Sequence, residues 1–117
     1  MLSVPSALKI FLCTQPADMR KGHDGLAALV EEVLCADPLS GHLFVFRNKR
    51  ADRLKLLYWD NDGYAFWYKR LEAGSFRFPL PPAGAQQVTV SAAELTMLLD
   101  GVDLSSIRRR KRYRRPA

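Results

Sequence analysis

Four turn-forming residues between two strand-like runs constrain the fold more than any other feature of the sequence. Asp60–Gly63 (DNDG) stands between Leu54–Trp59 and Tyr64–Leu71, and both runs are rich in residues that favour strands. A turn of this composition reverses the chain within a few residues, so the two runs are predicted to pair as an antiparallel hairpin. The apolar run Leu43–Arg47, which precedes the polar turn Asn48–Asp52, extends this hairpin to a three-stranded meander.

Two helices and two further strands are predicted around this meander. Apolar residues recur at helical spacing through Gly22–Cys35, which gives that segment one apolar face. A second helix with an apolar stripe begins at Ser91, because Ser91 and Glu94 have the spacing of a capping box. Leu8–Thr14 and Val88–Val90 are rich in strand-forming residues. The predicted fold class is α+β, with a small antiparallel sheet of about four to six strands packed with two amphipathic helices.

The extent of the folded part follows from where the apolar residues stop. A chain of 117 residues suits a single domain. Ser75–Phe78 is a candidate for a short edge strand, and the proline-rich segment Pro79–Ala85 is predicted to be a connector. We expect one compact domain over residues 1–104 and a disordered basic tail over residues 105–117.

The basic residues of the chain are concentrated at its C-terminal end. Of the 18 lysines and arginines, seven lie in the last ten residues, and the remainder, with 11 basic and 12 acidic residues, is close to neutral. The seven are Arg108, Arg109, Arg110, Lys111, Arg112, Arg114 and Arg115. Closely spaced cations repel one another and bind phosphate, so this tail is predicted to be disordered and to contact nucleic acid. A solubilising or membrane-surface tail is the alternative, which the lack of an accompanying apolar or lipidation signal disfavours.

A second group of cations surrounds the predicted turn between the first two strands of the meander. It consists of Arg47, Lys49, Arg50, Arg53 and Lys55. A basic loop between strands can lie over the phosphate backbone of a nucleic acid. The same residues are explained equally well by a solvated turn in which Asp52 pairs with a neighbouring arginine, and both interpretations stay open here.

Aromatic residues crowd into the second half of the meander. Eight of the twelve in the chain fall between Tyr58 and Phe78. Strand alternation places Tyr64, Phe66 and Tyr68 on one face of the sheet and the intervening tryptophan on the other. These rings are candidates for the core and for cross-strand pairing, or for stacking on unpaired bases.

The polar residues predict no enzyme active site. Asp52, Asp60 and Asp62 could in principle hold divalent metals, but hydrogen bonding within a turn explains the last two. The two histidines and the two cysteines, Cys13 and Cys35, form no zinc-binding spacing, and the cysteines are expected to be reduced. Nucleophile triads, phosphate-binding loops and dinucleotide-binding motifs are absent from the sequence. We therefore expect a protein without catalytic residues, metal or cofactor. Because no run resembles a signal peptide or a membrane span, we also expect it to be cytoplasmic, with no membrane partner.

Three segments of the chain resemble the TnpB accessory proteins of the IS66 class of bacterial insertion sequences. They are MRKGHDGLAALV at 19–30, GHLFVFRNKRADRLKLLYWDNDGYAFWYKRLEAGSFRFP at 41–79 and ELTMLLDGVD at 94–103, and the likeness covers residues 8–104. The positions that recur in this family are Met19, Arg20, Asp24, Gly25, Asn48, Arg50, Asp52, Arg53, Trp59, Asp60, Gly63, Tyr68, Arg70, Leu71, Gly74, Phe76 and Pro79. Two positions depart from the family pattern: His23 replaces an apolar or aromatic residue, and Leu104 stands where a tryptophan is frequent.

The resemblance implies an accessory factor for DNA transposition rather than a transposase. Its implied partners are DNA, at transposon ends or at the target, together with the separate transposase and the other accessory protein of the same element. The family has no agreed catalytic residues to carry over. Two functions are favoured: a DNA-binding accessory factor, or an adaptor that contacts only proteins of the transposase complex. A metal-dependent nuclease that uses Asp52 and Asp60 is a third, less favoured hypothesis.

Two segments are the candidates for specific contacts in either function. One is the basic hairpin Arg47–Lys55 and the other is the loop Met19–Gly25. Arg20 precedes a predicted helix start, where backbone N–H groups also favour an anion. Arg20, Asp24 and Asp52 are therefore further candidates for contact with DNA or a protein partner.

Overall fold

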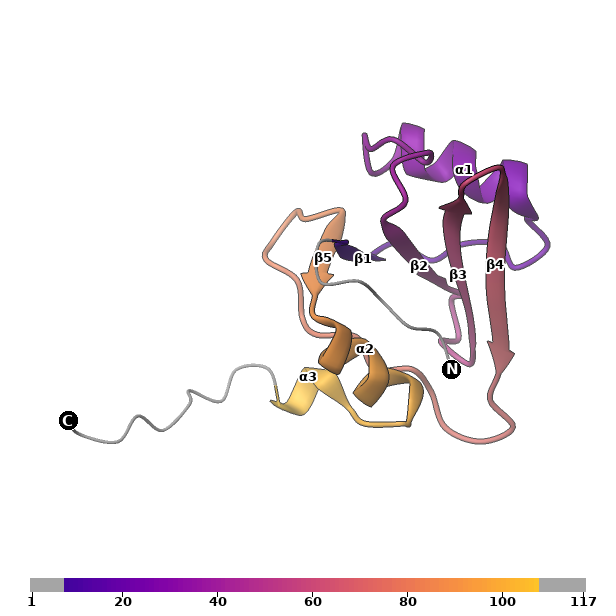
Figure 1. The fold of residues 1–117 in the computed structure, drawn as a ribbon. Helices are drawn as coiled ribbons and strands as arrows, with labels where there is room; N and C mark the ends of the chain where they lie inside the picture. The colour runs from indigo at the N-terminus through magenta and orange to yellow at the C-terminus, as the bar shows by residue number, and fades with distance from the viewer. Residues whose placement is uncertain (1–7, 108–117) are drawn as a thin grey trace.

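The computed structural model describes residues 8–107 (Figure 1). The seven predicted tail contacts, Arg108, Arg109, Arg110, Lys111, Arg112, Arg114 and Arg115, lie outside the described residues.

Five strands form one mixed sheet in the order β4-β3-β2-β1-β5. Their bounds are Ile10–Cys13 for β1, Leu43–Arg47 for β2, Arg53–Asp60 for β3, Gly63–Arg70 for β4 and Gln87–Val90 for β5. The predicted meander is confirmed, because β2, β3 and β4 pair antiparallel in sequence. At the other end of the sheet, β1 pairs antiparallel with β5 but parallel with β2. The α+β fold class is thus confirmed, with one parallel strand pair that the all-antiparallel prediction missed.

Helices cover both faces of this sheet, as Figure 1 shows. Helix α1 (His23–Glu32) connects β1 to β2 and packs on one face, here called the α1 face. Helices α2 (Ala92–Leu99) and α3 (Leu104–Ile107) pack on the opposite α2 face. The crossover through α1 explains why β1 and β2 run parallel, since parallel neighbours need a long connection between them.

Alternation along β2 supplies both halves of the core. Leu43 and Val45 point to the α2 face, whereas Phe44 and Phe46 point to the α1 face, and all four are buried. This explains the continuous apolar run in the sequence, because a central strand covered on both sides needs apolar residues at every position.

The helix ends follow the sequence signals in part. At α2, the Ser91 hydroxyl accepts a hydrogen bond from the Glu94 N–H (3.1 Å), and the Glu94 carboxylate accepts one from the Ser91 N–H (2.9 Å). The predicted capping box is therefore present. Helix α1 ends three residues before the predicted limit, because Cys35 adopts a left-handed conformation (φ 51°). Both Cys35 and the buried Cys13 are free thiols, and burial raises the pKa of Cys13.

The segment Ser75–Phe78 forms no strand, so its assignment as a candidate edge strand was wrong. Instead it crosses the end of the sheet, where the Phe76 N–H donates to the Ala51 carbonyl (2.7 Å). The side chains of Phe76 and Phe78 are buried in the core of the α2 face. The aromatic pattern here therefore reflects a loop that completes the core.

Candidate nucleic-acid interface

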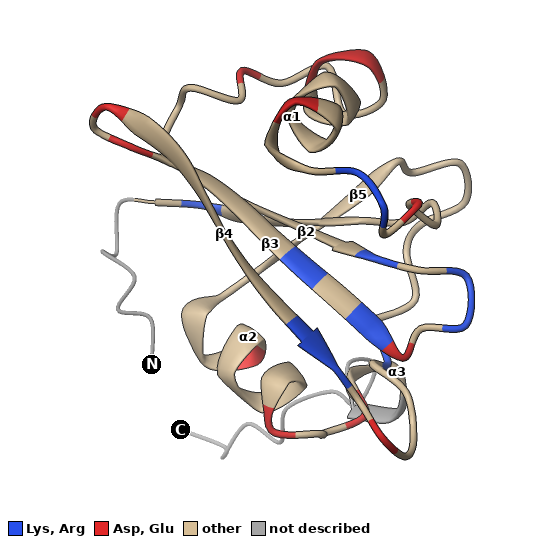
Figure 2. Cartoon of the chain, turned by 90° about the vertical axis from the view of Figure 1, so that its right-hand side faces the viewer, with Lys and Arg blue, Asp and Glu red and all other residues tan. Residues whose placement is uncertain are grey.

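Charged residues are distributed unevenly over the fold. Figure 2 shows lysines and arginines at one end of the sheet, on β3, at the end of β4, in the β2–β3 turn and in the loop before α1. Acidic residues lie on the helices and at the turn between β3 and β4, at the opposite end of these two strands, and three more, Asp18, Asp52 and Glu72, lie among the cations at the basic end. A nearly neutral domain therefore presents a locally basic surface.

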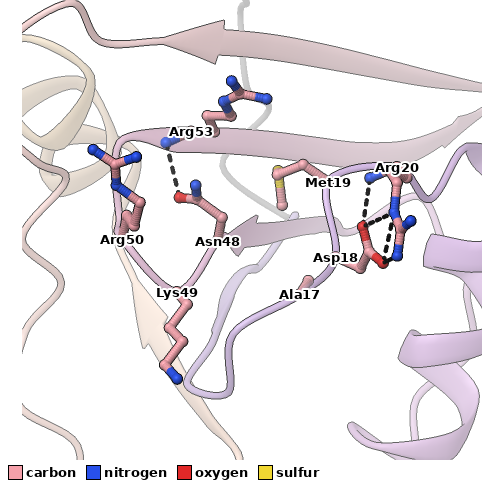
Figure 3. Close-up of a pocket in the computed structure, with 8 residues that line it drawn as sticks. All are labelled: Ala17, Asp18, Met19, Arg20, Asn48, Lys49, Arg50 and Arg53. Atoms are coloured by element: carbon pink, nitrogen blue, oxygen red, sulfur yellow. Dashed lines mark hydrogen bonds and ion pairs between the residues drawn. The ribbon is translucent and has the colours of Figure 1, made fainter.

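Two segments far apart in sequence meet at this basic end and enclose an open hollow of about 410 Å³. We call it the basic pocket, and it is lined by Ala17, Asp18, Met19, Arg20, Asn48, Lys49, Arg50 and Arg53. Figure 3 shows Asn48 and Met19 toward its middle, with the charged ends of Lys49, Arg50, Arg53 and Arg20 spread around it. The structure thus joins the two regions that the sequence singled out separately.

Lys55 fixes one wall of the basic pocket from inside the protein. Its ammonium donates to the carbonyls of Met19 and Lys21, both at 2.8 Å, and its side chain is only 6% exposed. The ammonium also lies 4.9 Å from the Phe66 ring centroid and 5.0 Å from that of Tyr68. Lys55 is therefore not placed for the surface contact with nucleic acid that the sequence suggested, and it acts as an internal support of the loop.

Arg47 also lies away from the basic pocket. Its guanidinium donates to the Phe76 carbonyl (2.9 Å) and stacks 4.0 Å from the centroid of the Phe78 ring. Burial lowers the pKa of Arg47, and the charge of nearby Arg77 adds to this effect. The backbone of Arg47 still contributes, because its carbonyl accepts a hydrogen bond from the Ala17 N–H (2.9 Å) and so helps Lys55 to hold the loop that forms this wall.

Asn48 organises the β2–β3 turn that carries the exposed cations. Its amide donates to the Asp52 carboxylate (2.7 Å), and its side-chain oxygen accepts from the Arg53 N–H (3.0 Å). The hydrogen bond from Asn48 lowers the pKa of Asp52, with smaller contributions from the charges of Arg50 and Arg53. Asp52 is therefore engaged with the turn itself, but its partner is Asn48 and not the neighbouring arginine that the solvated-turn interpretation expected. Lys49 and Arg50 are exposed at the tip of the turn.

The turn contains one strained residue. Ala51 has φ 60°, a left-handed conformation that costs residues with a side chain about 1–2 kcal/mol. We expect Ala51→Gly to raise the free energy of unfolding by about 0.5–1 kcal/mol, because glycine adopts the left-handed conformation without strain. The gain is smaller than the strain itself, because glycine also makes the unfolded chain more flexible. Urea unfolding followed by circular dichroism measures the change. Ala65→Gly in β4 is the control and is expected to destabilise, and a destabilising Ala51→Gly would contradict the prediction.

The loop wall of the basic pocket contains the one carboxylate among its lining residues. Arg20 and Asp18 form an exposed ion pair (2.7 Å), and the hydrogen bond from Arg20 holds the pKa of Asp18 well below its usual range. Asp24 lies one turn further, exposed at the start of α1, and does not line the basic pocket. Arg20 is thus placed with Lys49, Arg50 and Arg53, whereas Asp24 is not.

Two residues near Arg53 were not among the predicted contact residues, although Tyr68 was a candidate for stacking on bases and both recur in the family pattern. Arg70 of β4 is the cross-strand partner of Arg53, and exposed Tyr68 is the partner of Lys55. The signal was available, because the turn at Asp60–Gly63 fixes the register and counting back from it pairs Arg53 with Arg70.

Within residues 8–107, no three side chains of histidine, cysteine, aspartate or glutamate gather closely enough to hold a metal ion. None of the helices described in that range has the length and apolar character to cross a bilayer.

Comparison with known proteins gives a family match over almost the whole chain. The model of the family described as "IS66 Orf2 like protein" matches residues 8–109. The chain is 43% identical over 116 residues to "Uncharacterized protein y4jC" of Sinorhizobium fredii (strain NBRC 101917 / NGR234), covering 99% of this chain and 97% of the relative. It is 39% identical over 103 residues to "Uncharacterized protein y4hO" of the same strain, covering 88% of each chain. No solved structure matches.

Proposed function

The chain belongs to the family of IS66 Orf2-like proteins, which are accessory proteins of insertion sequences, and we propose that it assists transposition by binding DNA through the basic pocket. The observation that carries this proposal is that Arg20, Lys49, Arg50 and Arg53, from two segments of the chain, line one hollow with their charged ends spread around it. With four cations and one carboxylate along it, the hollow has a net positive charge, and Arg and Lys side chains are the usual contacts of a phosphate backbone.

The local ion pair leaves the cations available to phosphate. Arg20 is paired with Asp18, but the two side chains are 90% and 43% exposed, so the pair is solvated and weak. Exposed pairs of this kind can exchange one partner for a phosphate oxygen at little cost. Lys49, Arg50 and Arg53 form no ion pair with any residue in the range 8–107.

A salt-titrated binding assay on the full chain tests the proposal. The double variant Lys49→Gln with Arg50→Gln is expected to bind duplex DNA about tenfold more weakly at low salt. It should also reduce the slope of log affinity against log salt by about 2, because two phosphate contacts are lost. The tail stays in place in every variant, so the change reports on the domain.

The matched control is Lys9→Gln with Arg77→Gln, which removes the same charge from exposed positions that do not line the basic pocket. Its effect on affinity is expected to be at most twofold. Equal losses in the two double variants would show that only overall charge matters. If the full chain binds no DNA at low salt, the proposal fails, and the alternative function is favoured, in which the protein is an adaptor that contacts only proteins of the transposase complex.

A further inference from the structure

We propose that the α1 face next to the basic pocket binds an unpaired nucleotide, whose phosphate lies between Arg53 and Arg70 and whose base stacks on Tyr68. This inference rests on the proposed DNA-binding function and deepens it, because it names single-stranded DNA as the preferred form.

The phosphate position is indicated by two like charges that face each other. Arg53 and Arg70 are direct cross-strand partners on β3 and β4, so both side chains project side by side from the α1 face of the sheet. Like charges directly opposite one another in a sheet are unfavourable. Arg70 is paired with Glu72 at 2.9 Å, but both side chains are more than half exposed. An anion between the two guanidinium groups turns their repulsion into two charge-assisted contacts.

The base position is indicated by a ring that is exposed yet fixed. Tyr68 is 45% exposed, more than Trp67 (36%), the other exposed aromatic residue of β4. Its hydroxyl lies 3.5 Å from the Arg53 guanidinium, and the Lys55 ammonium lies 5.0 Å from its ring centroid. Lys55 is in turn held by two backbone carbonyls, so the ring has a fixed cation beside it while 45% of the residue stays exposed.

The preference for a single strand follows from the ring. In a duplex each base is stacked between its neighbours, so only an unpaired base can lie flat on Tyr68. Arg53 lines the basic pocket and also faces Arg70, so it links the basic pocket to the surface around Tyr68 and Arg70. Figure 2 shows the basic ends of β3 and β4 beside the basic β2–β3 turn. A strand anchored at Tyr68 can therefore continue over Arg50 and Lys49.

The test compares oligothymidylate with a hairpin duplex of equal length, using the full chain at one salt concentration. Tyr68→Leu is expected to weaken oligothymidylate binding about tenfold and to change duplex binding by less than twofold, since it removes stacking and no charge. Tyr68→Phe should retain the wild-type affinity for both DNAs. Trp67→Leu, an exposed aromatic on the opposite face, is the matched control and should change neither.

Arg70→Gln provides a second variant at an exposed position and should weaken oligothymidylate binding more than duplex binding. Equal effects of Tyr68→Leu on the two DNAs, or no effect on either, would overturn the inference. If duplex binding still depends on Lys49 and Arg50 in that case, the proposed function survives without it. If the full chain binds neither DNA, both fail together.

Discussion

Replacing Phe76 by alanine is expected to lower the free energy of unfolding by about 3–5 kcal/mol, the cost of removing a buried phenyl group from a core that cannot collapse to fill the space. Phe76 is 2% exposed and packs in the core of the α2 face, although it belongs to a segment without regular secondary structure. Its backbone also contacts the basic end of the sheet, since its N–H donates to Ala51 and its carbonyl accepts from Arg47. Urea unfolding monitored by circular dichroism gives the change.

The control for this variant is Leu39→Ala, because Leu39 is 52% exposed and its loss is expected to cost under about 0.5 kcal/mol. A change below about 1 kcal/mol for Phe76→Ala would show that the segment after β4 is not part of the core. It would also remove the reason to regard that segment as a support of the β2–β3 turn.

Lys55→Met is expected to destabilise the protein by about 2–3 kcal/mol, although it removes a charge from the interior. The methionine side chain keeps the apolar stem but leaves the Met19 and Lys21 carbonyls without their donor. A buried acceptor that loses its partner costs about 1–3 kcal/mol. Part of the loss for the two carbonyls is offset, because the variant no longer has to bury an ammonium group. Urea unfolding measures the loss, and amide hydrogen exchange should show faster exchange in the 17–21 loop.

Lys69→Met is the matched control, since Lys69 is a half-buried lysine on the neighbouring strand with one longer hydrogen bond, to the Leu99 carbonyl at 3.3 Å. Its expected cost is below about 1 kcal/mol. If the two variants were equally destabilised, the two carbonyl contacts of Lys55 would have no special role. Unchanged exchange in the loop would lead to the same conclusion.

The local part of this structure was predictable from sequence, whereas the pairing of distant segments was not. The hairpin at Asp60–Gly63 and the capping box at Ser91 each depend on a few neighbouring residues, and both are present. The parallel pairing of β1 with β2 depends on which strands meet across the α1 crossover, and no local pattern specifies that.

In the candidate site, too, the local features were predictable from sequence and the contacts between distant segments were not. Lys49 and Arg50 are exposed because a tight polar turn exposes its tip. Lys55 was expected at the surface because charged residues are seldom buried, yet carbonyls more than thirty residues earlier in the chain make its burial possible. The hollow itself arises only when the Ala17–Arg20 loop meets the turn, so no single segment could reveal it.

The position of β1 determines when during synthesis the protein can finish folding. This strand lies between β2 and β5, and β5 is the last of the strands described over residues 8–107 to leave the ribosome. A nascent chain that has not yet reached Gln87 therefore exposes one edge of β1, together with the α2 face of the sheet, which α2 and α3 cover only later. Unpaired strand edges and open apolar faces are what aggregation and proteolysis act on, so interrupted translation should yield products that are rapidly cleared. Shortened versions of the protein that end before β5 would likewise have an unpaired β1 edge and an uncovered α2 face.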